Sequence, residues 1–395
     1  MLPYIISLMV SSIRNRREKN RQQNWIFLGS LPKVSLLIAF RNEYQRIRPL
    51  LESLASLDYP EEKLEIIMVD DHSEDKTVEI IRDFATEKCL NISLFNLPEG
   101  KAGKKAAMVL AREKATSDYL FFTDADVQLP SGWILKMLNC QQNSGAEMVC
   151  SEVEVVFRKG ILNIFESLEQ AALVALSAAT VASGKVFLCN GAGYLVNKQV
   201  LSRLVLPEAW HRSPGGDDVM LLHAMHKAGN KIAYCRLDGS RVMLEPSGAK
   251  EFLQQRIRWG SKVFLGNSSG NFIQALLVWI FHSLNLWLFV SIVWGSGIYA
   301  VFFCFLVGFF FRGLWEAALV RDFISPGLQQ SSIFQNQRNG SSSEKSEPMA
   351  IAGMFSLLAP FYSLYIMLAG PLLFFFRSFS WKGRTYSSRK SPPTF

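Results

Sequence analysis

The chain has 395 residues, a formal net charge of +8, a hydrophobic fraction of 49% and a charged fraction of only 19%. This composition is more apolar than that of most soluble proteins, and most of the apolar excess lies after residue 270. The basic residues stand mostly beside apolar segments and no nucleic-acid-binding motif occurs. We therefore expect anionic lipid headgroups, and not a nucleic acid, as the partner of the positive charge.

The first 32 residues are expected to form an appendage. Residues 2–13 are apolar but too few to cross a bilayer, and a basic stretch at residues 14–21 follows them. A secretory signal peptide has the opposite order, with its basic residues first. The segment is therefore interpreted as an anchor at the cytoplasmic membrane face, with a solvated tail as the alternative. The six cysteines form no C-x-x-C pair, which is typical of reduced thiols in a cytoplasmic domain.

Residues 33–262 are predicted to form one α/β domain. Short apolar runs typical of strands alternate with segments of helical periodicity, which indicates a mostly parallel sheet with helices on both faces. The expected strands are residues 34–40, 65–69, 92–95, 119–122 and 147–157. The expected helices include residues 75–85, 104–114, 161–182, 219–227 and 249–262.

Residues 263–376 are predicted to be a membrane region. Three apolar segments, at 272–294, 298–320 and 349–376, are each long enough to cross a bilayer, and a polar loop occupies 321–348. We expect a multi-pass protein of the cell (inner) membrane with a cytoplasmic catalytic domain. Three full spans would place the basic tail, residues 377–395, outside, whereas the positive-inside rule places it in the cytoplasm. Either the proline-containing third segment is re-entrant or an earlier segment does not span.

Acidic residues gather at the ends of the predicted strands. Asn42-Glu43, Asp70-Asp71 and Asp124-Ala125-Asp126 each follow an apolar run, and the carboxyl ends of parallel strands meet at one edge of a sheet. Oxygen-rich acid pairs suit Mg²⁺ or Mn²⁺ and, through the metal, a diphosphate. Any one pair alone is more typical of an ordinary strand-end turn.

Further polar groups follow in the second half of the domain. Lys104 opens a helix, where an anion would be favoured, and Gly216 precedes the acid pair Asp217-Asp218. One of these acids suits a general base, while helix capping would account for the other. The glycines of residues 189–193 allow either close approach of a ligand or a plain turn. Gln255, Arg258 and Trp259 lie just before the membrane region, where Arg and Trp are also common as interfacial anchors.

Taken in order, these motifs resemble the membrane-bound family 2 glycosyltransferases, a group that includes cellulose, chitin and hyaluronan synthases. The resemblance covers about residues 33–262 and implies a GT-A fold of the nucleotide-diphospho-sugar transferase type. It implies a nucleotide-binding role for Glu43, Asp70 and Asp71, metal binding by Asp124 and Asp126, and Asp218 as the catalytic base. One departure is Asp217, where the family often has Glu.

The same resemblance implies that Lys104, Asp124 and Arg258 contact the donor, and that Gln255 and Trp259 contact the acceptor. The expected reaction is inverting, metal-dependent transfer of a sugar from a nucleotide sugar, a UDP-sugar being the expected donor, to a lipid-linked, membrane or saccharide hydroxyl. Three alternatives remain. They are a processive polysaccharide synthase, a nucleotidyltransferase that releases pyrophosphate, and an inactive membrane scaffold.

Overall fold

The computed structural model describes most of the predicted catalytic domain and little of the membrane region. The described residues are 2–186, 188–206, 210, 216–256, 283, 364, 378–381 and 384–387. The predicted spans therefore lie outside the described residues, apart from two single positions, and so do Arg258 and Trp259. The chain divides into two compact units, which we describe separately. The sheet unit comprises Arg14–Val156 and Leu176–Glu245, and the second unit includes Phe157–Ala175 and the described residues from Pro246 on.

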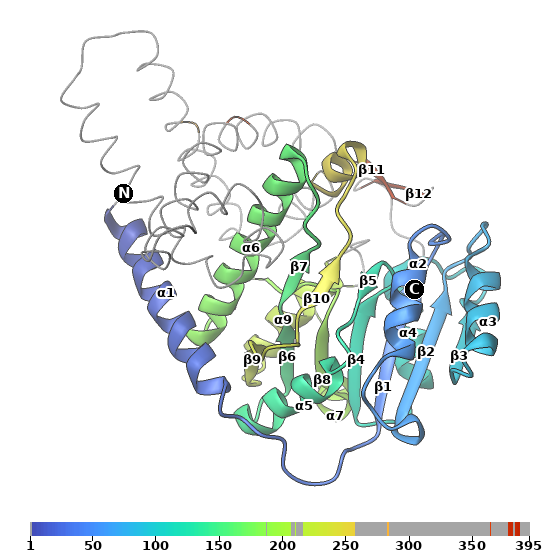
Figure 1. Ribbon diagram of the computed structural model, residues 1–395, viewed down its shortest axis with the longest axis horizontal. Coiled ribbons are helices and arrows are strands. Elements are labelled where there is room, and N and C mark those ends of the chain that lie inside the picture. The colour runs from blue at the N-terminus through green and yellow to red at the C-terminus, as the bar shows by residue number, and fades with distance from the viewer. Residues whose placement is uncertain are drawn as a thin grey trace, which may run out of the picture. The chain divides into compact units, whose positions relative to one another are not determined.

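The sheet unit is built on a seven-stranded mixed sheet of order β3-β2-β1-β4-β8-β6-β9 (Figure 1). Its strands are β1 (Val34–Phe40), β2 (Leu64–Asp70), β3 (Ile92–Asn96), β4 (Tyr119–Asp124), β6 (Met148–Ser151), β8 (Tyr194–Asn197) and β9 (Ile232–Cys235). Only β8 runs antiparallel to its neighbours, β4 and β6, among these seven strands. The prediction of a mostly parallel α/β sheet is confirmed.

Helices cover both faces of this sheet. On one face, Leu36, Ile38 and Phe40 of β1 join a core with α2 (Ile47–Ala55), α3 (Thr77–Glu87) and α5 (Trp133–Ser144). Successive strand residues point to opposite faces, so Leu37 faces the other side. On that side α4 (Lys104–Lys114) packs against β1 and β2, with Ala107 and Ala111 fully buried. Small side chains there let the helix approach the sheet closely.

The predicted strand at residues 147–157 is two strands in two sheets. It divides at Glu152 into β6 and β7 (Val153–Val155), and β7 pairs with β10 (Val242–Leu244), which in turn pairs with β5 (Val127–Gln128). Glu152 is only 4% exposed, and its carboxylate binds the guanidinium groups of Arg236 and Arg241. The single long strand was therefore wrong, because a buried charge that must reach two arginines interrupts the apolar run.

The amino-terminal helix α1 (Leu2–Gln22) includes the basic stretch that follows the apolar residues. Its last residue, Gln22, donates to the carbonyl of Tyr234 at 2.8 Å and accepts from the amide of Arg236 at 2.7 Å. The Arg236 guanidinium donates to the carbonyl of Asn15 at 2.7 Å. The alternative prediction of a solvated tail is therefore wrong for residues 15–22, because Asn15 and Gln22 are hydrogen-bonded to Tyr234 and Arg236.

In the second unit, the start of α6 (Ile161–Ala182) binds the helix at residues 249–256. Arg256 is 5% exposed, lies 3.5 Å over the ring of Phe252 and pairs with Glu169, while its Nη1 is 3.8 Å from Glu166. Among the described helices, α6 alone is long and apolar enough to cross a membrane by length and composition. The continuation of the helix predicted at 249–262 lies outside the described residues.

Candidate functional site

The loops after β1 and β2 are joined at the carboxyl edge of the sheet. Phe40 and Asp70 are partners in the register of the two strands, and the Arg41 guanidinium donates to the carbonyl of Asp71 at 2.8 Å. Asn42, with φ 51°, accepts the amide of Glu74 at 2.8 Å. The left-handed backbone at Asn42 is a conformation that asparagine tolerates better than most residues. The two predicted clusters therefore form one edge, as expected.

Both acids of the Asp70-Asp71 pair hold loops in place. Asp70 accepts the amide of Ser73 at 3.0 Å, and Asp71 accepts the amide of Gly103 with both carboxylate oxygens at 3.0 Å. Gly103, with φ 98°, is the residue before α4, so Asp71 fixes the start of that helix. Glu43 is only 5% exposed, and its backbone amide donates to the Thr77 hydroxyl at 2.8 Å. These bonds order the edge at which a nucleotide was predicted.

Lys104, the first residue of α4, forms an ion pair with Asp124 at the end of β4. Both side chains are about a quarter exposed, at 23% and 29%, so the pair borders solvent and is not sealed in the core. Asp126 follows two residues later. Burial raises the pKa of Asp126, the neighbouring Asp124 carboxylate raises it further, and Arg46 and Lys104 oppose the rise.

Gly191 lies next to both Lys104 and Asp218. A Cβ atom built on Gly191 would lie 3.1 Å from the Lys104 ammonium and 3.3 Å from the Asp218 carboxylate. The φ of Gly191 is not in the left-handed region, so a missing side chain, and not an unusual backbone, is what this position contributes. The glycine-rich segment was expected to be either a plain turn or a place of close approach. At Gly191 it is a place where two side chains, those of Lys104 and Asp218, approach the backbone closely.

The late acid pair lies inside the first turn of α9 (Asp217–Lys227), directly after Gly216 with φ 77°. Gly216 occupies the position before the helix and has no side chain, and no side-chain cap hydrogen bond forms there. Asp218 accepts the amide of Val219 at 2.8 Å with Oδ1, while Oδ2 is the atom that approaches Gly191. A carboxylate in the first turn of a helix interacts favourably with the helix dipole.

Five residues thus define the acid cleft: Lys104, Asp124, Asp126, Asp217 and Asp218. Burial would lower the pKa of Lys104, but the carboxylates of Asp124, Asp217 and Asp218 raise it well above its usual value. The lysine therefore remains a cation beside these acids, and Arg46 is a second cation near Asp126. The neighbouring carboxylates of Asp124 and Asp126 favour a further cation.

The acid cleft fits a divalent cation that is shared with a substrate. Among the described residues, no three acidic, histidine or cysteine side chains gather into a complete metal site. Asp124 and Asp126 supply two carboxylates, and Mg²⁺ is commonly held by one or two carboxylates together with substrate phosphates. The mutual repulsion of the two acids is a further reason for a cation to bind there.

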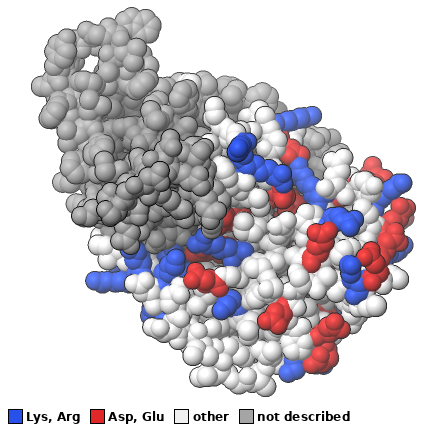
Figure 2. Space-filling view, in the orientation of Figure 1, with Lys and Arg blue, Asp and Glu red and all other residues white. Residues whose placement is uncertain are grey.

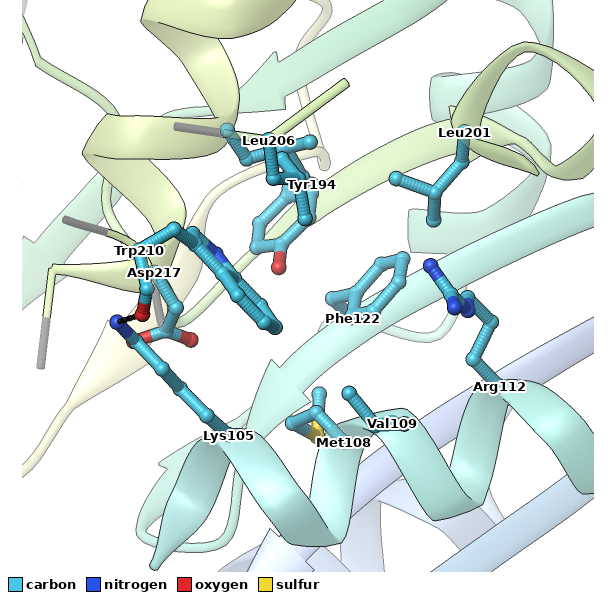
Figure 3. Close-up of a pocket in the computed structure, with 11 residues that line it drawn as sticks. Lys105, Met108, Val109, Arg112, Phe122, Tyr194, Leu201, Leu206, Trp210 and Asp217 are labelled. Atoms are coloured by element: carbon cyan, nitrogen blue, oxygen red, sulfur yellow. Dashed lines mark hydrogen bonds between the residues drawn. The ribbon is translucent and has the colours of Figure 1, made fainter. Parts of the chain in front are cut away.

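A pocket beside the acid cleft was not predicted (Figure 3). Lys105 donates to the carbonyl of Trp210 at 2.6 Å and lies 5.0 Å from the centre of its ring. Phe122 and Tyr194 stack with ring centres 4.6 Å apart. The doubled lysine at 104–105 was the available hint, because consecutive helical residues point in different directions, but nothing in the sequence connects Lys105 with Trp210.

Other predicted residues lie elsewhere. Gln255 belongs to the second unit, where it accepts a hydrogen bond from Arg256. On the described part of the face in Figure 2, charges of both signs are interspersed and no single basic patch forms.

Part of the chain is similar in sequence to a known protein family and to named relatives. Residues 35–201 match Glycosyl transferase family 2. A beta-monoglucosyldiacylglycerol synthase of Trichormus variabilis is 28% identical over 207 residues, which are 50% of this chain and 42% of that protein. A poly-beta-1,6-N-acetyl-D-glucosamine synthase of Staphylococcus epidermidis is 26% identical over 228 residues, 57% of this chain and 53% of that protein. The chain thus spans about half the length of these relatives.

A solved mannosyltransferase of Pyrobaculum calidifontis, in complex with GDP-Man and Mn²⁺, has a TM-score of 0.49 and 18% identity, covering 90% of this chain and 99% of its own. The matched residues, most of which lie in the sheet unit, are therefore similar to the domain of the family 2 glycosyltransferases.

Proposed function

We propose that the chain transfers a sugar from a nucleotide-diphosphate sugar to an acceptor hydroxyl, with inversion at the anomeric carbon. The supporting observation is the convergence of the Lys104 ammonium and the Asp218 carboxylate on Gly191. Transfer of this kind needs a proton acceptor for the attacking hydroxyl and positive charge for the leaving diphosphate. One cleft offers both groups.

In this mechanism Asp218 accepts the proton of the acceptor hydroxyl as that oxygen bonds to the anomeric carbon. The bond between the anomeric carbon and the diphosphate oxygen breaks on the opposite face, and Lys104 and Arg258 offset the charge that develops on the diphosphate. Asp124 and Asp126 would hold Mg²⁺ or Mn²⁺, which when bound neutralises charge on the diphosphate.

The remaining residues are assigned to binding. Glu43, Asp70 and Asp71 border the nucleoside of the donor, Asp217 supports the base, and Trp259 with Gln255 contacts the acceptor. We propose a lipid-linked or membrane acceptor and a membrane location with a cytoplasmic catalytic domain. The apolar segments of the sequence and the relative named a glucosyldiacylglycerol synthase support this choice. Processive polymer synthesis is the second candidate, supported by the relative named a poly-N-acetylglucosamine synthase.

The test is turnover by the purified full-length protein in detergent. UDP-glucose, UDP-N-acetylglucosamine and GDP-mannose are each supplied with Mg²⁺, Mn²⁺ or EDTA, and the released nucleotide is identified. A nucleoside diphosphate released only with metal, and a product of inverted anomeric configuration by NMR, is the expected result. Release of pyrophosphate would identify a nucleotidyltransferase, and donor binding without turnover across an acceptor panel would favour a scaffold.

A further inference from the structure

A pocket beside the acid cleft lies between α4, the strands β4 and β8, and α9 (Figure 3). Its wall is formed by Lys105, Met108, Val109, Arg112, Phe122, Tyr194, Leu201, Leu206, Trp210, Asp217 and Leu221. The pocket and the acid cleft share Asp217, and Lys105 follows Lys104 on α4. Asp218, the proposed proton acceptor, is the next residue after Asp217 on α9.

The interior of this pocket is apolar and its charges lie at the ends. Lys105 and Asp217 occupy one end and Arg112 the other, with the stacked rings of Phe122 and Tyr194 between them (Figure 3). The Lys105 ammonium already donates to the Trp210 carbonyl. Burial, and then the Asp217 and Asp218 carboxylates, raise the pKa of Tyr194 well above its usual value, so its hydroxyl stays neutral. Few polar groups remain inside for a hydroxylated ligand.

The size of the pocket decides between ligand classes. Its cavity volume is about 40 Å³, which is room for about three water molecules. A sugar ring would need more space and several hydrogen-bond partners. A chain of a few carbon atoms needs neither, and its burial against Phe122, Leu206 and Trp210 is favourable.

We propose that this pocket, the alkyl subsite, holds the aliphatic carbons that adjoin the acceptor hydroxyl. The inference rests on the proposed transferase function, and it deepens that function by naming the substrate class as an alcohol with an apolar neighbour to its hydroxyl. In this arrangement the carbons enter between α4 and α9, and the hydroxyl meets Asp218 at the first turn of α9.

Binding is tested first without turnover. The probe is 2,2,2-tribromoethanol, a short alcohol whose bromine atoms quench tryptophan fluorescence on contact. We expect a saturable component of quenching in the full-length protein that is absent in Trp210→Phe and at least 10-fold weaker in Leu206→Phe and Val109→Phe, which fill the pocket from two sides. Val205→Phe adds the same ring at a neighbouring side chain that is 89% exposed, and it serves as the matched control. Equal quenching in Leu206→Phe, Val109→Phe and Val205→Phe would overturn the site.

The assignment to the acceptor is tested next. With a donor that turns over, the ratio of alkyl glycoside to hydrolysed sugar is measured for methanol, ethanol, propanol and butanol. Each methylene that enters the pocket should raise the ratio by about 3- to 4-fold, and Leu206→Phe should flatten the series. A ratio independent of chain length overturns the acceptor role even if tribromoethanol binds. If no donor turns over, the transferase proposal fails and the acceptor role with it, while the quenching experiment still decides whether the pocket binds an alcohol.

Discussion

Two groups of charged residues in the sheet unit are built in opposite ways. In the acid cleft the Lys104–Asp124 pair borders solvent, and both of its side chains are about a quarter exposed. The other group, which we call the buried ion network, is Glu152, Glu154, Arg236 and Arg241. It has two charges of each sign, and the Arg236 and Glu152 side chains are only 1% and 5% exposed.

The buried ion network serves the stability of the fold, whereas the acid cleft serves the activity. Taking a charge out of water costs several kcal/mol unless a partner compensates it, and the buried ion network meets this requirement by balance. It also joins β7, β9 and α1, because Arg236 reaches the carbonyl of Asn15. The acid cleft has its ion pair at a solvent-accessible edge, where its acids can bind a cation or accept a proton. We expect substitutions in the first group to change turnover and those in the second to change stability.

Asp218→Asn is expected to have the largest effect. The amide has nearly the same shape but cannot accept the proton, so turnover should fall by about 10²- to 10⁴-fold. The melting temperature should stay nearly the same, because the amide keeps the shape of the side chain and can still accept the Val219 amide. Initial rates with the active donor and a thermal melt measure both quantities. Asp238→Asn, the same change at an exposed residue, is the control. An undiminished rate in Asp218→Asn would remove the base assignment.

Arg236→Met should have the largest effect on stability. It removes the more deeply buried of the two arginines that pair with Glu152 and takes away the donor to the Asn15 carbonyl, and breaking a buried pair costs about 3–5 kcal/mol. In a domain of this size the melting temperature should fall on the order of 10 °C. Arg48→Met breaks the exposed pair with Glu52, whose side chains are 71% and 58% exposed, and should cost no more than about 0.5 kcal/mol. Equal melting temperatures for the two variants would refute the contrast.

Lys104→Met removes the ammonium group from the acid cleft while keeping most of the aliphatic stem. A hydrogen bond to a charged group contributes about 1.5–3 kcal/mol, so kcat/KM for the donor should fall by about 10- to 100-fold. Lys104→Arg should restore part of that loss. The control is Lys114→Met on the same helix, an exposed lysine whose ammonium lies 5.3 Å from the Phe95 ring. If Lys104→Met lowered the melting temperature and left kcat/KM unchanged, Lys104 would belong with the structural charges.

Features that depend on residues close together in the sequence were predictable, and features that depend on distant residues were not. The sheet, its helices and the strand-end acids Asp70, Asp71 and Asp124 were predictable, because apolar periodicity and the residue after a strand are read within a few positions. The buried ion network was not predictable, since Asn15, Glu152 and Arg236 are distant in sequence and meet only once the chain folds. The Lys105–Trp210 contact was missed for the same reason.

Gly191→Ala should have the smallest effect and tests the geometry most directly. The new methyl group would lie 3.1 Å from the Lys104 ammonium and 3.3 Å from the Asp218 carboxylate, so one of the two must move by a few tenths of an ångström. Since a displacement of 1 Å can cost about 10²-fold, we expect roughly a 3- to 10-fold fall in kcat. Stability should hardly change, because both side chains border solvent.

The matched control is Gly132→Ala, where φ is −85° and a methyl group would have no neighbour within 4 Å. Gly193→Ala is unsuitable, because its methyl group would come within 2.9 Å of Ser151 and Val242 in the core. If the Gly191 and Gly132 variants had the same kcat, the approach of Lys104 and Asp218 at Gly191 would have no catalytic consequence. A fall in kcat for Gly191→Ala alone, at unchanged melting temperature, would place the reacting groups beside Gly191, because the added methyl group presses on Lys104 and Asp218 and not on the core.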